Sequence, residues 1–93
     1  MPDTRQLSDL AGIGKAALHD CHRLGVTSVG QLAGCDAREL YERLSAMEGQ
    51  MHDICVLDTF ACAIAQARDP QLPADQCRWW WWSRQRKAAN QGK

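Results

Sequence analysis

The feature that most constrains the fold is the spacing of apolar residues between positions 53 and 69. Within this stretch, apolar side chains recur at intervals of three and four, namely at Ile54, Leu57, Phe60, Ala61, Ile64 and Ala65. This period matches the 3.6-residue turn of an α-helix and excludes the alternation of a half-buried strand. Asp53 precedes the run, and Asp69-Pro70 ends it because a residue before proline avoids helical geometry. We therefore predict a long helix here, at the centre of the core.

Shorter helices are predicted before it from the same spacing and from caps and glycines. They cover residues 7–10, residues 15–24, a short piece through Val29 and Leu32, and a stretch that opens at Asp36 and ends at Gly49. Runs of β-branched residues are absent. The sequence thus predicts an all-α fold, a single small domain of about five short helices over residues 1–70. A Pro/Trp-rich basic segment over residues 71–93 follows.

Charge is divided unequally along a chain of 93 residues whose formal net charge is zero. Residues 1–77 hold six Lys/Arg against eleven Asp/Glu and net −5, whereas residues 78–93 hold five Lys/Arg and no acid and net +5. The basic segment is either a solvated extension that leans on the acidic body or a contact for phosphate backbones.

Four consecutive tryptophans, Trp79 to Trp82, stand in the basic segment. Four successive residues span about 300° of a helix, so they cannot all be buried on one face. We expect Pro70 and Pro73 to turn the chain back and at least two indoles to dock on the body. An exposed indole is predicted either to stack on a base or to form a protein or homodimer interface.

The sharpest local motif is Leu7-x-x-Leu10-x-Gly12-Ile13-Gly14-Lys15. It resembles the helix-hairpin-helix motif of nonspecific DNA-binding proteins. Glycines let the backbone approach a phosphate, and the first N–H groups of the following helix point outward with a partial positive charge. The phosphate donors are therefore expected at Gly12, Ile13, Gly14, Lys15 and Ala16, with a second contact from the Lys15 side chain. Auxiliary contacts are expected from Arg84, Arg86 and Lys87.

The resemblance extends beyond this motif. The run Leu24-Gly25-Val26-Thr27-Ser28-Val29 through Ala33 is similar to runs in the C-terminal domain of the RNA polymerase alpha subunit and in TfoX-type competence regulators. The order of motifs over about residues 5–87 resembles the small bacterial helix-hairpin-helix proteins of the pathogenicity locus family, some of them labelled mitomycin-resistance proteins. This resemblance implies a SAM/helix-hairpin-helix-like fold and nucleic-acid binding rather than a reaction. One departure is Leu18, where such motifs commonly have a small residue at the helix crossing.

Other chemistry is not expected. The three histidines and five cysteines match no standard metal spacing, and a Cys55 nucleophile with His52 as its base would lack an oxyanion hole. We therefore predict no enzyme activity, no metal and no cofactor. The sequence contains neither a stretch typical of a membrane-spanning helix nor a signal-peptide pattern, so we expect a cytoplasmic protein without a membrane partner.

The function predicted from the sequence is binding to the DNA phosphate backbone without base readout, by a monomer or weak homodimer. The alternative is a protein-interaction module that uses the acidic body and exposed tryptophans, and the net charge of −5 favours it. The two differ in salt dependence and in their need for Lys15, which only DNA binding requires.

Overall fold

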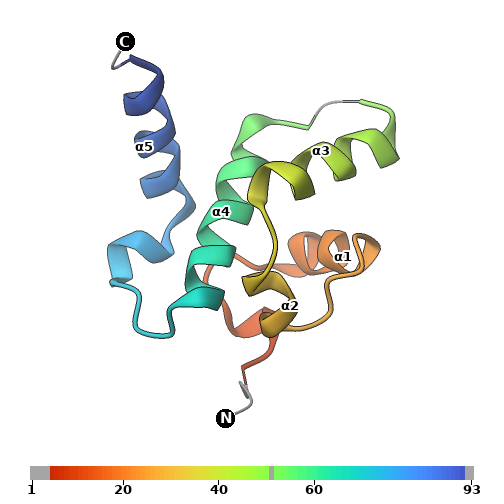
Figure 1. The fold of residues 1–93 in the computed structure, drawn as a ribbon, viewed down its shortest axis with the longest axis horizontal. Helices are drawn as coiled ribbons and strands as arrows, with labels where there is room; N and C mark the ends of the chain where they lie inside the picture. The colour runs from red at the N-terminus through yellow and green to blue at the C-terminus, as the bar shows by residue number, and fades with distance from the viewer. Residues whose placement is uncertain (1–4, 51, 92–93) are drawn as a thin grey trace.

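Five α-helices and two short 3-10 helices make up the part of the chain that the computed structural model describes, residues 5–50 and 52–91 (Figure 1). In order they are η1 (Leu7–Asp9), α1 (Lys15–Arg23), α2 (Val29–Ala33), α3 (Ala37–Glu48), α4 (Ile54–Arg68), η2 (Ala74–Cys77) and α5 (Trp79–Gln91). These residues contain no strand, and the prediction of a small all-α domain is confirmed. Among the described helices, none has the length and apolar character needed to cross a membrane.

The predicted helix starts rest on side-chain caps. Ser28, Asp36 and Asp53 stand directly before α2, α3 and α4. Their side chains accept hydrogen bonds from backbone N–H groups two or three residues later, at 3.1, 2.8 and 2.9 Å. Each bond satisfies one of the N–H groups that a helix start leaves without an intrahelical partner. Local sequence therefore determines where these three helices begin.

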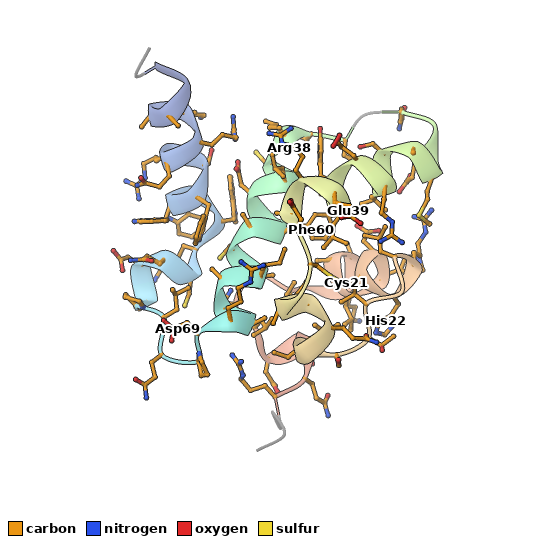
Figure 2. All side chains as sticks on the ribbon, viewed as in Figure 1. Cys21, His22, Arg38, Glu39, Phe60 and Asp69 are labelled. Atoms are coloured by element: carbon orange, nitrogen blue, oxygen red, sulfur yellow. The ribbon has the colours of Figure 1, made fainter. Side chains whose placement is uncertain are left out.

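The helix α4 lies at the centre of the fold, as its spacing predicts. It packs against α2 and α3 on one side and against α5 on the other (Figure 1). Phe60, in the middle of α4, is only 2% exposed, and it points toward α3 and α1, where Cys21 is fully buried (Figure 2). This arrangement places the core between α4 and the first three helices.

Two segments differ from the sequence prediction. The first expected helix is only one 3-10 turn, η1, which Asp9 stabilises by accepting the Gln6 N–H at 2.8 Å. The basic segment beyond Arg78, expected as a docked tail, forms the 13-residue helix α5. The sequence does not predict this helix, because four adjacent tryptophans do not show the spacing of apolar and polar residues that is typical of a helix.

The expected docking of the tryptophans is present. Trp79, Trp81 and Trp82 are half-buried, whereas Trp80 remains 43% exposed. The Trp82 indole N–H donates to the Gln76 carbonyl at 2.8 Å and so ties the first turn of α5 to η2. Trp82 lies beside Ala61 of α4, whereas Trp81 and Trp79 are partly covered by edge contacts with Trp82 and Trp80.

An exposed ion pair joins the ends of α1 and α3. Arg23 Nη1 lies 3.0 Å from Glu48 Oε1, and this hydrogen bond lowers the pKa of Glu48 below its ordinary value of 4.5. A carboxylate whose folded-state pKa is depressed stabilises the fold fully above its ordinary pKa, and this contribution is lost as the pH falls through the lower, folded value.

We therefore expect the Glu48→Gln variant to lose less stability than the wild type on acidification. The measurement is urea unfolding at several pH values between about pH 6 and pH 3. The free energy of unfolding should fall less steeply with pH in Glu48→Gln. Equal slopes for the two proteins would show that the contacts of Glu48 with Arg23 and His52 contribute nothing to folding.

Candidate functional site

The candidate site is the turn between η1 and α1. The Ile13 N–H donates to the Leu10 carbonyl at 3.2 Å and closes the turn, and Gly12 stands inside it with a φ of +86°. Side chains are strained in this left-handed region, so Gly12 meets a backbone requirement. Gly14 then caps α1 with an extended φ of −88°, and it supplies no side-chain cap. The turn therefore leads directly into α1 and leaves the first N–H groups of this helix uncovered.

Gln66 of α4 holds this turn in place. Its side-chain Oε1 accepts the Ala11 N–H at 2.9 Å, and its Nε2 donates to the Ala11 carbonyl at 2.9 Å. The Gln66 side chain is buried, with 6% exposed. Because both polar groups of the Ala11 backbone are paired with one amide, the turn is fixed to the central helix. Sequence reasoning missed Gln66, since nothing local links it to a residue 55 positions away.

The first turn of α1 is open to solvent. Gly14, Lys15 and Ala16 are all exposed, and Lys15 makes no ion pair with any described residue. The first four N–H groups at a helix start lack intrahelical acceptors and carry part of the positive end of the helix dipole, and in α1 the first helical bond is from the Leu18 N–H to the Gly14 carbonyl. Ile13 differs from the other predicted donors, because its N–H is engaged by Leu10 and its side chain is buried.

Leu18 lies half-buried against the core, beside Leu7 of η1. Because a single 3-10 turn precedes the hairpin, two full α-helices do not cross at this position.

The predicted auxiliary residues of α5 divide into two groups. Arg84 and Lys87 are exposed and form no ion pair among the described residues. Arg86 instead forms a bidentate ion pair with Asp58 of α4, with Nε 3.0 Å from Oδ1 and Nη2 3.0 Å from Oδ2. Asp58 is 2% exposed, so Arg86 neutralises a buried carboxylate and fastens α5 to α4.

A groove of about 600 Å³ joins the turn to the start of α5. We call it the hairpin groove, and its walls include Ala11, Gly12, Leu72, Arg78, Trp79 and Trp80. Its volume lies within the range of about 300 to 1,000 Å³ that small-molecule sites span. The hairpin and the tryptophan segment, 65 or more residues apart in the sequence, are therefore neighbours in the fold.

Four acidic side chains of the body cap the starts of helices or turns. Asp9, Asp36, Asp53 and Asp69 each accept a backbone N–H at the start of a helix or turn. Hydrogen bonding from the Cys55 N–H lowers the pKa of Asp53. These carboxylates keep their negative charge, because accepting hydrogen bonds stabilises the ionised form, so they cap helices and turns without reducing the net charge of −5.

Three of the five cysteines have thiols with raised pKa values. Burial raises the pKa of the Cys21 and Cys62 thiols to about 11, and hydrogen bonding with Asp53 raises the pKa of Cys55. These thiols are protonated at neutral pH, whereas a nucleophile must be a thiolate. Within residues 5–50 and 52–91, no three His, Cys, Asp or Glu side chains are gathered so as to hold a metal ion.

The Gln66 contacts yield a direct test of the turn. Gln66→Met keeps the length of the side chain but removes both hydrogen bonds to Ala11, so we expect a loss of about 1–3 kcal/mol in the free energy of unfolding. Urea unfolding measures this loss. The control is Gln85→Met, which changes an exposed glutamine of α5 and should leave stability unchanged. A Gln66→Met protein as stable as the control would show that the turn does not depend on this amide.

Comparison with known proteins gives a consistent family assignment. The family model described as "Pathogenicity locus" matches residues 2–88. The protein named mitomycin resistance protein McrB from Streptomyces lavendulae is 42% identical over 72 residues, which cover 77% of this chain and 67% of that protein. No solved structure is significantly similar to this chain. The match over nearly the whole chain, together with the identity to McrB, shows that this protein belongs to the pathogenicity locus family.

Proposed function

We propose that this protein binds DNA through its phosphate backbone, without reading base sequence, at the turn between η1 and α1. In this proposal η1, the glycine turn and α1 act as a helix-hairpin-helix. The observation that carries it is the uncapped, solvent-exposed start of α1, preceded by a turn that Gln66 fixes to the core. An anion is stabilised at such a helix start because N–H groups and the helix dipole both favour negative charge.

Each candidate donor has a distinct part in the proposal. The N–H groups of Gly14, Lys15 and Ala16 face the phosphate, and the Lys15 ammonium adds a full positive charge. Gly12 contributes by letting the backbone approach closely rather than by a charge. Arg84 and Lys87 extend the positive surface along α5, and Arg86 supports it indirectly by holding α5 in place.

Gly14 offers a substitution that separates binding from folding. A Cβ built at Gly14 would meet no atom within 4 Å, and its φ of −88° suits any residue. A Cβ is therefore accommodated at Gly14, and Gly14→Val adds two methyl groups next to the amides that the phosphate is proposed to approach. Gly12→Ala lacks this advantage, because the φ of +86° strains any side chain.

The experiment is a fluorescence-anisotropy titration of a labelled duplex. The wild type should bind with a Kd of about 10⁻⁴ to 10⁻⁶ M at physiological salt, more tightly at low salt, and equally for unrelated sequences. The double variant Gly14→Val with Lys15→Glu should not bind. The matched control, Arg38→Glu, makes the same charge change at an exposed arginine of α3 that forms no ion pair with a described residue, and it should bind nearly as well as the wild type.

The protein-interaction module remains the competing function. It is favoured by the exposed Trp80 and by the negative net charge of residues 1–77. If the wild type binds neither duplex nor single-stranded DNA at low salt, the protein-interaction function is favoured over DNA binding.

A further inference from the structure

Trp80 is the one exposed Trp, Tyr or Phe side chain among the described residues, and it lines the hairpin groove with Gly12. The Arg78 guanidinium carbon lies 5.3 Å from the Trp80 ring centroid, so this cation covers one face of the indole. The Trp80 side chain nevertheless remains 43% exposed to solvent. A large aromatic group held at the mouth of a groove by its neighbours is suited to receive another flat, apolar ring.

Positive charge continues from Trp80 along one face of α5. Arg84 and Lys87 follow Trp80 by four and seven residues, and this spacing places all three on the same side of the helix. All three are exposed, whereas Trp82 and Arg86 lie on the side of α5 that faces the body. Residues 78–93 contain no acid, so nothing on this helix opposes a negatively charged strand.

Aromatic and cationic groups in this order fit a nucleic-acid strand whose bases are unpaired. Indoles stack on any base because every base has a π-face, and the cations beside them follow the phosphates. A base inside a duplex is stacked on both faces and cannot enter the groove, whereas an unpaired base can. The groove volume of about 600 Å³ is large enough for a single base.

We propose that the hairpin groove holds one unpaired nucleobase, stacked on Trp80, while the strand runs along Arg84 and Lys87. The protein then prefers single-stranded or frayed nucleic acid over a fully paired duplex. This inference rests on the proposed function, because a phosphate at the start of α1 brings the strand beside the groove.

The test compares a single-stranded oligonucleotide with a blunt duplex of the same sequence, both titrated at low salt. The wild type should bind the single strand more tightly, with quenching of tryptophan fluorescence. Trp80→Ala should weaken single-strand binding by about 5- to 100-fold and leave duplex binding unchanged, whereas Trp80→Phe should retain most of the single-strand affinity. Met47→Ala, at an exposed apolar residue of α3, is the matched control and should change neither affinity.

A second variant removes the charges and keeps the aromatic group. Arg84→Gln with Lys87→Gln should also weaken single-strand binding, and it addresses the same face if Trp80→Ala is poorly folded. Equal affinities for the two DNA forms, unchanged in Trp80→Ala and in the double variant, would overturn the inference and leave duplex binding at α1 standing. Failure of the wild type to bind either form at low salt would overturn both proposals.

Discussion

A chain that ends at Asp75 is expected to lose its cooperative thermal melt. This truncation removes α5, which packs against α4, and with it three half-buried indoles. Withdrawing apolar area from water stabilises by about 25 cal/mol per Å², so losing these indoles costs more than about 5 kcal/mol. Because domains of this size are stable by only about 5 to 15 kcal/mol, the truncated chain should be largely unfolded.

The truncation has a second effect, because it also removes Arg86. Asp58, which is 2% exposed on α4, would lose the guanidinium that neutralises it. Far-UV circular dichroism during heating checks the result. The control is a chain that ends at Ala89, which keeps all four tryptophans and Arg86 and should melt like the wild type. A cooperative melt of the chain ending at Asp75, at an unchanged temperature, would contradict the docking of α5.

The intact protein provides an independent reading of this docking, since all four of its tryptophans lie at the start of α5. Emission from half-buried indoles is blue-shifted relative to indoles in water. Unfolding followed by tryptophan emission should therefore coincide with unfolding followed by circular dichroism. An earlier transition in emission would show that α5 separates before the body unfolds.

Phe60→Ala is expected to produce the largest effect of any single core substitution. Phe60 is 2% exposed and is among the largest fully buried side chains, between α4 and the first three helices. Truncating a buried phenylalanine typically costs about 3–5 kcal/mol, because apolar contacts are lost and a cavity remains. Urea unfolding should show this loss with an unchanged dependence on denaturant. The same substitution at the exposed Met47 should cost little, and equal losses at both sites would contradict the placement of the core.

The parts of the fold that sequence predicted are those determined by local chemistry. The helix α4 follows from its apolar period, and Ser28, Asp36 and Asp53 mark helix starts because a short polar side chain caps its own neighbours. Gly12 marks a turn because its left-handed backbone suits glycine. For η1, a local pattern of two leucines could not distinguish an α-helix from a single 3-10 turn.

The parts that sequence could not predict depend on distant partners. Gln66 serves the turn only because α4 brings it to Ala11, and the helical pattern contains no sign of that contact. The charge of Arg86 alone predicts a phosphate contact, whereas its ion pair with Asp58 places it against α4. Asp58 itself gave a usable signal, since a carboxylate on the apolar side of the most hydrophobic helix needs a buried cation.

The measurement that tests the central proposal most directly is the salt dependence of duplex binding by the wild type and by Gly14→Val with Lys15→Glu. The logarithm of the wild-type affinity should fall linearly with the logarithm of salt concentration, with a slope of about −0.9 for each phosphate neutralised. The double variant should melt like the wild type and show no binding at low salt. A double variant that binds the duplex with the same affinity and the same slope would contradict phosphate binding at the start of α1.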